Sequence, residues 1–400
     1  MLDYTLFGES HGPVVGVLLE NIPAGLTVDE TFIAGQMLRR AGKGGLTTAR
    51  CEEDKVEYLS GVFEGKTTGD PLVAVIRNGD VHSGDYEALK NTPRPGHADY
   101  AAWVKSNGHN DYRGGGHHSG RLTAPLVVAG SIAQTYLKEW GIIISAEVVG
   151  EDELRERAAA AKADGDSAGG QIRCTIDGLP AGLGDFGWKE SVDSEIARQV
   201  FAIPAVKAVG FGAGEGFAHM RGSKANDALR TDGEEIYTET NHAGGINGGM
   251  TNGMPVTFTV TFRPTPSISK KQKTVDIKSN ENVDIAIQGR HDACIALRAA
   301  PAVEAAAALA VMRLLPREDS LAGYRRELDE IDKDLVALAT RRLEIAGKIG
   351  GYKKEHRLPI QDAVREAEVL CSRGDLAPEY RRQVEELFSL LMEQSREEQK

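Results

Sequence analysis

Residues 299–315 read AAPAVEAAAALAVMRLL and mark the boundary between two unlike halves of the chain. The segment is rich in alanine and carries apolar residues at helical spacing, which predicts a buried helix. Glycine makes up 46 of the 400 residues and is concentrated before this boundary, whereas charged residues dominate after Pro316. We therefore expect two domains, residues 1–315 and residues 316–400.

The composition excludes several classes of function. With 41% apolar and 26% charged residues, the chain has the composition of a soluble globular protein, and no run of 18 apolar residues predicts a membrane span. The formal net charge of −12 argues against nucleic-acid binding, which needs a basic face, but allows a small anionic substrate held by local arginines. The first residues do not resemble a secretory signal, and the four cysteines lie too far apart for a metal motif. We therefore expect a reducing, cytoplasmic location.

The first half has the patterns of mixed strands and helices. In residues 256–262, Val and Phe alternate with Thr, which predicts a half-buried strand. Glycine clusters at 114–116 and 244–249 lie near His, Ser and Arg residues, and glycine lets a backbone approach a ligand closely. Tight turns alone would also need glycines, but this clustering favours a site built from loops.

Four segments combine small residues with side chains that transfer protons or bind anions. They are GESHG (8–12), RPGHADY (94–100), GGGHHSGR (114–121) and GRHDACIALRAAPAVEA (289–305). Histidine exchanges protons near neutral pH, and arginine offers a planar fork to carboxylates and phosphates. A single histidine is more often structural, but several of them in glycine-rich loops indicate catalysis on an anionic substrate.

In order and spacing, these four motifs resemble chorismate synthase from near Met1 to about Leu315. The resemblance implies a β-α-β sandwich of two sheets and helices, a homotetramer, and bound FMN in the reduced state. It also implies a lyase reaction of aromatic amino acid biosynthesis. In that reaction, phosphate is lost by 1,4-anti elimination from 5-enolpyruvylshikimate 3-phosphate, giving chorismate without net redox change.

The resemblance also implies roles for individual residues. His11 and His97 match the two catalytic histidines, and Asp292 matches the residue that helps to deprotonate flavin N5. The residues implied in substrate binding are Arg39, Arg50, Arg94, Arg121 and Arg290. The residues implied in flavin binding are His117, His118, Ser119, Gly248, Arg263, Pro264, Thr265, Pro266, Ser267 and Arg290.

The second half has the pattern of three helices. Leu and Ile recur at a 3–4 spacing through residues 328–349, and no proline occurs before Pro359, which predicts one helix of about 55 Å. A second helix fits residues 361–373 and a third begins near Pro378. Arg342 is the charged exception in the apolar stripe. Because a buried arginine is costly unless it is paired, three interpretations of Arg342 stay open. It is a snorkelling residue at the edge of the stripe, a partner in an interhelical salt bridge, or part of an internal polar pocket.

This all-α half resembles the all-helical class of chorismate mutases over about residues 320–399, so the whole chain is expected to be of the α+β class. The resemblance implies an isomerase reaction, the rearrangement of chorismate to prephenate, with no cofactor and no metal. The implied catalytic residues are Arg342, Lys353 and Gln399. The implied substrate-binding residues are Arg325, Asp362, Arg365, Glu366 and Ser395.

The spacing of two arginines predicts an assembly. Arg325 and Arg342 are 17 residues apart, roughly 25 Å along one helix, which is too far for both to bind one chorismate. We therefore expect mutase sites shared between two chains. Two alternatives stay open: helices that serve only dimerisation or regulation, and a first half that binds flavin or phosphate without turnover. The presence of all the expected residues favours a bifunctional enzyme.

Overall fold

The computed structural model describes residues 2–41, 45–47, 53–79, 89–187, 190–233, 235–287, 291–315 and 321–399. In the last of these ranges, the side chains of residues 321–327, 329–330 and 333–334 are not described. The chain divides into two compact units, residues 1–315 and residues 316–400, which are described here one after the other.

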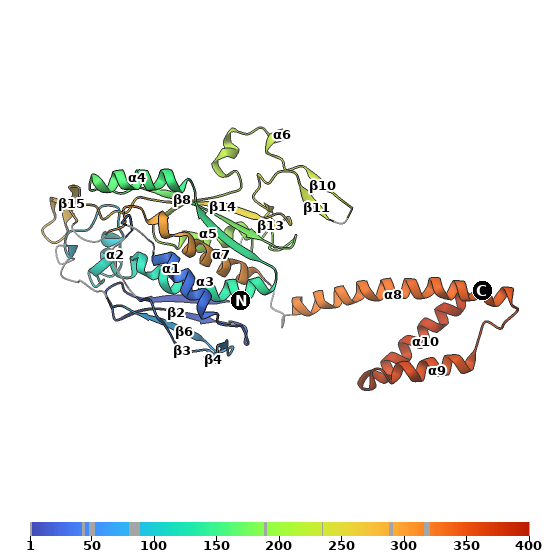
Figure 1. The fold of residues 1–400 in the computed structure, drawn as a ribbon. Helices are drawn as coiled ribbons and strands as arrows, with labels where there is room; N and C mark the ends of the chain where they lie inside the picture. Colours follow the sequence, from blue (N-terminus) through green and yellow to red (C-terminus); the bar gives the residue numbers. More distant parts are fainter. Residues whose placement is uncertain are drawn as a thin grey trace. The chain divides into compact units, whose positions relative to one another are not determined.

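The first unit contains two antiparallel four-stranded sheets (Figure 1). The first sheet has the order β1-β2-β6-β3, with β1 Asp3–Gly8, β2 Val14–Glu20, β6 Leu72–Arg77 and β3 Val56–Ser60. The second has the order β7-β8-β14-β9, with β7 Ile143–Val148, β8 Gly170–Asp177, β14 Val256–Phe262 and β9 Val206–Phe211.

Helices fill the space between these sheets. Helix α3 (Thr123–Glu139) packs on β2 and β6 of the first sheet, whereas α7 (Ala300–Leu314) packs on β7 and β8 of the second. The two helices also pack against each other, and α1 (Glu30–Ala41) contacts both of them. Helix α5 (Val192–Phe201) lies against α7 and β9. The order sheet, helices, sheet confirms the expected sandwich.

Burial explains why these segments form the core. The predicted strand is β14, whose Val256, Phe258, Val260 and Phe262 are at most 1% exposed while the threonines between them are half-buried. The alanine-rich segment quoted above forms α7, which is buried from Ala300 to Met312. Small side chains on α7 let it lie deep between the layers, because a helix without bulky residues can approach its neighbours closely.

The remaining elements of the first unit are short or peripheral. They are β4 (Val62–Phe63), β5 (Lys66–Thr67), β10 (Leu229–Thr231), β11 (Ile236–Thr238), β12 (Ile246–Asn247), β13 (Met250–Thr251), β15 (Gln272–Asp276), β16 (Glu281–Ile285), α2 (Asp99–Lys105), α4 (Glu151–Ala163), α6 (Gly222–Ala225), and the 3-10 turns η2 (Arg113–His118), η3 (Gly120–Leu122), η4 (Gly214–His219) and η5 (Ile295–Arg298).

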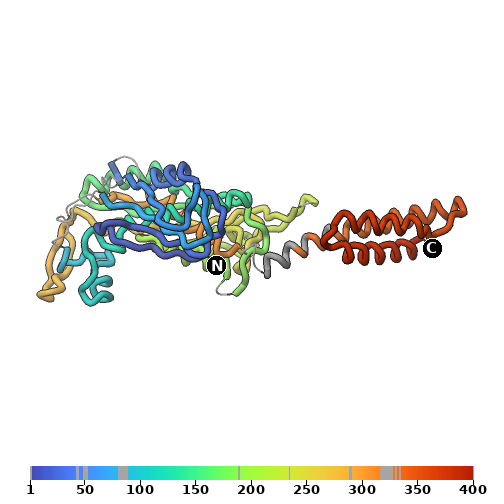
Figure 2. Tube along the Cα trace, turned by 90° about the horizontal axis from the view of Figure 1, so that it is seen from below, coloured from blue at the N-terminus to red at the C-terminus, as the bar shows by residue number. Residues whose placement is uncertain are grey.

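The second unit is helical, as expected. Helix α8 (Leu321–Glu355) is continuous over 35 residues, and α9 (Ala363–Gly374), the turn η6 (Pro378–Tyr380) and α10 (Arg381–Glu398) follow. Helix α10 lies alongside both α8 and α9 (Figure 2). At one contact the backbones meet closely, because a Cβ on Gly350 would lie 2.7 Å from the Cα of Gln399.

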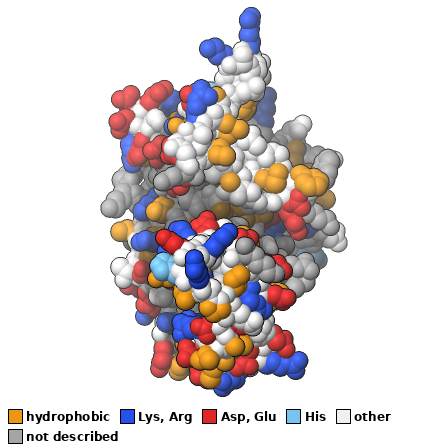
Figure 3. All heavy atoms as spheres, turned by 90° about the vertical axis from the view of Figure 1, so that its right-hand side faces the viewer, with side chains coloured by type: hydrophobic (Ala, Val, Ile, Leu, Met, Phe, Trp, Pro, Cys, Tyr) orange, Lys and Arg blue, Asp and Glu red, His pale blue; other side chains and the backbone are white. Residues whose placement is uncertain are grey.

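Charged side chains of both signs share the surface of the protein (Figure 3). On the face shown in Figure 3, Lys and Arg side chains are interspersed with Asp and Glu, so the coloured atoms form no extended basic patch. None of the described helices is long and apolar enough to cross a membrane. Within the described ranges, no cluster of His, Cys, Asp or Glu could hold a metal, and Cys174, Cys294 and Cys371 are free thiols.

The contact between α3 and α7 depends on Gly130, because a Cβ there would overlap the Cα and Cβ of Ala305. We expect Gly130→Ala to destabilise the first unit by about 2 kcal/mol through overpacking, although alanine favours helices. Gly35→Ala on α1 is the matched control, since nothing lies within 4 Å of its added methyl group, and it should be neutral or stabilising. All three tryptophans precede residue 316, so denaturant unfolding followed by tryptophan fluorescence reports on this unit. Equal stability of both variants would contradict the packing.

Candidate functional site

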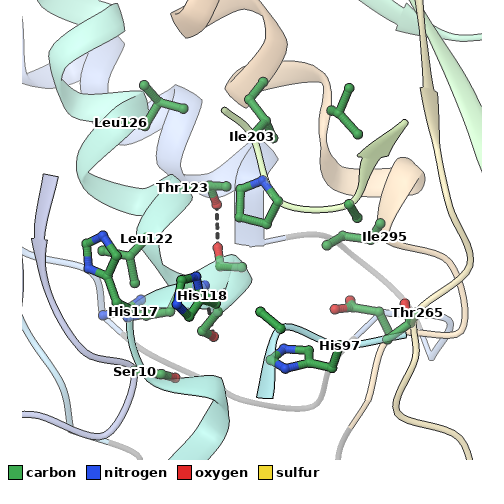
Figure 4. A pocket seen from close by; sticks show the side chains of 18 of the residues that line it. Ser10, His97, His117, His118, Leu122, Thr123, Leu126, Ile203, Thr265 and Ile295 are labelled. Carbon is green, nitrogen blue, oxygen red and sulfur yellow. Dashed lines mark hydrogen bonds between the residues drawn. The ribbon is translucent and has the colours of Figure 1, made fainter. Parts of the chain in front are cut away.

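The four sequence motifs meet at one cavity of about 670 Å³ in the first unit. Its volume is that of a site for a cofactor or a drug-sized ligand. Residues from every motif line it, among them Ser10, His11, Arg94, His97, His117, His118, Ser119, Arg121, His291, Asp292 and Arg298. Figure 4 shows the imidazoles of His97 and His118 across the cavity from the apolar side chains of Leu126 and Ile203. The cavity therefore offers both a polar and an apolar wall.

The run Gly114-Gly115-Gly116 places two histidines on the cavity. All three glycines have positive φ, at 58°, 87° and 56°. A Cβ on Gly114 would lie 2.5 Å from Cδ2 of His11, and one on Gly115 would lie 2.9 Å from Cε1 of His97. Only glycine satisfies both constraints, because other residues are strained at these angles and carry the Cβ. The glycine run is thus a cradle for both predicted catalytic rings.

His97 is held by a carboxylate and an arginine. Its Nδ1 lies 2.5 Å from Oδ1 of Asp99, and both oxygens of Asp99 accept from Arg94, from Nε at 2.7 Å and from Nη2 at 2.8 Å. Burial alone would raise the pKa of Asp99, but hydrogen bonds from Arg94 and His97 hold it well below its usual range. Asp99 is therefore ionised near neutral pH, and Nδ1 of His97 must carry the proton that it donates to the carboxylate.

Two buried arginines share a second carboxylate. Arg40 donates to Oδ2 of Asp54 at 2.5 Å, and Arg121 donates to Oδ1. Burial lowers the pKa of Arg40 to about 10, although Asp54 opposes the shift. Among the described residues, the buried Nε of Arg40 has no hydrogen-bond partner. A cation on the cavity wall with an unused donor is suited to an anionic ligand.

The resemblance implied Arg39 rather than Arg40. The structure places Arg39 outside the cavity lining, with two hydrogen bonds to the buried Glu304, at 2.7 and 2.9 Å. The buried positions of α1 are Ile33, Gln36, Met37 and Arg40. This 3–4 spacing is visible in the sequence and points to Arg40 as the inward residue.

Asp292 is bound by a second residue of its own motif. Arg298 donates from Nε and Nη2 to the two oxygens of Asp292, both at 2.8 Å, and the two side chains are 11% and 10% exposed. Arg298, like Asp54, was not expected in the site. Arg298 belongs to the motif GRHDACIALR (289–298), and this membership could have identified it as a site residue from the sequence.

The predicted flavin segments lie only partly on the cavity. Arg263, Thr265, Pro266 and Ser267 line it with His117, His118 and Ser119, whereas Pro264 and Gly248 do not. Ser267 accepts a hydrogen bond from Arg94 at 3.0 Å, and the buried Oγ1 of Thr265 has no partner among the described residues. Burial, then the charges of His117 and His97, lower the pKa of His118.

In the second unit, Arg342 lies against α10. It donates to Oγ of Ser395 at 2.5 Å and to the carbonyl of Leu391 at 2.7 Å, and burial lowers its pKa. Of the three interpretations of this arginine, the polar pocket is therefore favoured over an edge residue or a salt bridge. Lys353 donates to the carbonyl of Ile360 at 2.6 Å, and Oε1 of Gln399 is buried without a partner in the described part of the chain.

The other implied mutase residues lie along α9. Asp362 caps this helix by accepting from the backbone N of Arg365 at 3.0 Å, and the side chain of Arg365 is exposed next to Glu368. Glu366 forms an ion pair with Arg396, a residue that was not expected in the site, at 2.8 Å. Arg50, Arg290 and the side chain of Arg325 lie outside the described residues.

Comparisons with known proteins agree with both resemblances. Residues 2–315 match the family model of chorismate synthase, and residues 324–400 match that of chorismate mutase type II. A chorismate synthase of Thermococcus kodakarensis is 42% identical over 352 residues, covering 82% of this chain and 99% of that protein. One of Chitinophaga pinensis is 48% identical, covering 76% and 92%. A solved structure titled "Crystal Structure of Chorismate Synthase" matches with a TM-score of 0.61 and 25% identity over 82% of this chain and 97% of that one.

The close approach of Gly115 to the His97 ring can be tested by substitution. In Gly115→Ala the new methyl group would displace the His97 ring, so we expect phosphate elimination by the first unit to fall about 10²-fold or more. Gly25→Ala is the matched control, because Gly25 has nearly the same φ, 85° against 87°, and nothing within 4 Å. It carries the same backbone strain without the ring contact. Steady-state rates that fall equally in both variants would show that strain, and not the contact, matters.

Proposed function

The chain belongs to the chorismate synthase family and carries a chorismate mutase domain after it, and from this premise we propose how its residues work. It is a bifunctional enzyme of the shikimate pathway, a lyase and an isomerase. The proposal is that reduced FMN and 5-enolpyruvylshikimate 3-phosphate bind together in the large cavity. The single observation that carries it is the convergence of all four motifs there.

The residues of the cavity fit a phosphorylated flavin and a polyanionic substrate. Thr265 Oγ1 and Arg40 Nε are buried donors without a partner among the described residues. The apolar wall at Leu126 and Ile203 suits a flat aromatic ring, and the opposite wall carries imidazoles. When bound, reduced FMN supplies an electron-rich ring with a proton acceptor at N5.

The protein groups then have the following roles. Arg40 and Arg121, anchored on Asp54, hold the anionic groups of the substrate. The reaction removes a proton from C6 and breaks the bond to the phosphate oxygen, so phosphate leaves with the bonding electrons. His11 and His97 hold and transfer the protons that accompany loss of the C6 proton and of the phosphate. Asp292 serves as a proton acceptor, and Arg298 holds its carboxylate in place.

For the second unit we propose rearrangement of chorismate to prephenate in a site lined by Arg342, Lys353 and Gln399. Arg342 binds a carboxylate, and Lys353 meets the charge that develops on the ether oxygen. The position of Arg342 beside Ser395 supports this role, since both were implied as site residues.

We further propose a cytoplasmic homotetramer in which pairs of chains share mutase sites. The support is the apolar stripe of α8, where Leu328, Leu335 and Leu338 are 57%, 50% and 63% exposed. Because isolated helical units of this size are marginal, an exposed stripe of this kind indicates a missing partner helix. A tetramer with two-fold axes accommodates two such pairs.

The proposed function is tested by incubating the purified chain with 5-enolpyruvylshikimate 3-phosphate and reduced FMN. We expect prephenate as the end product, and chorismate to accumulate instead in Arg342→Ala, because that variant loses a charge-assisted carboxylate contact. Titration of the flavin spectrum should give tighter binding with substrate present. No spectral change would refute the FMN site, and wild-type protein that stops at chorismate would favour a non-catalytic helical module.

The two-chain mutase site is tested by mixing inactive variants. Arg325 and Arg342 both lie on the continuous helix α8, so one chain cannot bring both to one substrate. We expect Arg325→Ala and Arg342→Ala each to lose most mutase activity. A mixed dimer would regain it, because one of its two sites has both arginines. Subunit exchange must be confirmed by mass measurement. If exchange occurs and activity does not return, the shared site is wrong.

A further inference from the structure

His97 is contacted from two different sides. Its ring lines the large cavity, whereas Asp99 lines a separate cavity of about 220 Å³ together with Glu9, His109 and Asp111. Asp99 is therefore not on the wall that faces the proposed substrate. Its carboxylate reaches His97 from behind, at Nδ1, and is itself only 10% exposed.

Arg94 is committed to the same carboxylate. Its Nε and Nη2 donate to the two oxygens of Asp99, its backbone N donates to Oδ2 at 3.0 Å, and its Nη1 donates to Ser267. The Nη2 atom also lies 3.0 Å from Nδ1 and 3.4 Å from Nε2 of His97, so the guanidinium rests against the ring. With 5% exposure of its side chain, Arg94 has little surface left for a substrate.

This arrangement has a definite effect on the imidazole. Because an ionised carboxylate accepts the Nδ1 proton, Nε2 is the nitrogen left to exchange protons. Arg94 donates to both oxygens of the same carboxylate and so compensates part of its negative charge.

We propose that Asp99 and Arg94 are positioning residues for His97, with Asp99 fixing its tautomer and orientation and Arg94 offsetting the charge of Asp99. Arg94 thus acts on His97 through Asp99, whereas the resemblance had implied Arg94 in substrate binding. The inference rests on the proposed role of His97 in proton transfer.

Other side chains near the ring are basic. His118 of η2 interacts electrostatically with His97, and Arg263, which follows β14, donates to the carbonyl of Gly96, the residue before His97. Among the described residues, Asp99 is the one carboxylate hydrogen-bonded to His97.

The experiment is a double-mutant cycle on the full chain, with FMN and 5-enolpyruvylshikimate 3-phosphate. We expect Asp99→Asn to lower kcat about 10²-fold with little change in KM. The variant removes the carboxylate that orients His97 for proton transfer, whereas the groups that bind the substrate are unchanged. The shape of the pH–rate profile should also change, since the group that accepts the Nδ1 proton is replaced. When His97 is already replaced by Ala, adding Asp99→Asn should lower kcat by less than about twofold further.

Three controls separate the possible failures. Glu57→Gln breaks a similar fork, to Arg77 between β3 and β6, away from the histidines of the cavity, and should keep kcat and the pH profile. Mutase activity on added chorismate and flavin binding report whether each variant is folded. Arg94→Lys, as a second variant, should lower kcat at constant KM; a raised KM at constant kcat would make Arg94 a substrate ligand.

The outcomes distinguish the inference from the function on which it rests. If His97→Ala keeps normal turnover, the proposed role of His97 fails. If His97→Ala is inactive but Asp99→Asn has normal kcat and an unshifted pH profile, or adds a further tenfold loss to His97→Ala, the positioning role is wrong.

Discussion

The packing of α3 against α7 fixes the relative positions of the groups that act in the large cavity. Gly130 and Ala305 let the two helices touch, and each helix is entered through a 3-10 turn that faces the cavity. The turn η3 carries Arg121 to the site before α3, and η5 carries Arg298 to it before α7. A bulkier contact would shift one cation relative to the other. Interior packing transmits such shifts because it leaves few voids to absorb them.

Charge balance is the second constraint on this site. A buried arginine without a partner is costly, and a buried aspartate equally so. Asp54, Asp99 and Asp292 are each bonded to at least one arginine on the cavity. The arginines concerned are Arg40, Arg94, Arg121 and Arg298, one more than the carboxylates. The site therefore keeps a net attraction for anions while the carboxylates hold the cations in fixed orientations, which is the preorganisation that catalysis requires.

How much of this was predictable from sequence depends on the kind of signal. The strand at 256–262 and the helices after residue 316 were predicted because periodicity reports burial directly. The motif residues His11, His97 and Asp292 were predicted to share a site, and the structure places all three on one cavity. Asp54 was not, because a carboxylate next to Glu52 and Glu53 has no local pattern that distinguishes a buried partner from a solvated one. Arg39 and Arg40 are neighbours on one helix and point in different directions. A motif match identifies the segment but does not show which of the two arginines faces the cavity.

The helical unit shows a different limit, since a single chain leaves much of the apolar stripe of α8 exposed. Towards its C-terminal end, α8 is covered by α10, with Ala346 5% exposed and Gly350 against Gln399. Towards its N-terminal end, Leu328, Ile331, Leu335 and Leu338 stay 48% to 63% exposed. Burying the exposed part of each of these four side chains would contribute about 1 kcal/mol. A partner helix that covers all of them would therefore add several kcal/mol, a large fraction of the stability of a small domain. Arg325 lies on this uncovered end, whereas Arg342 and Lys353 lie on the covered one. In the proposed dimer, the association that covers this stripe would also bring Arg325 to the site of a second chain.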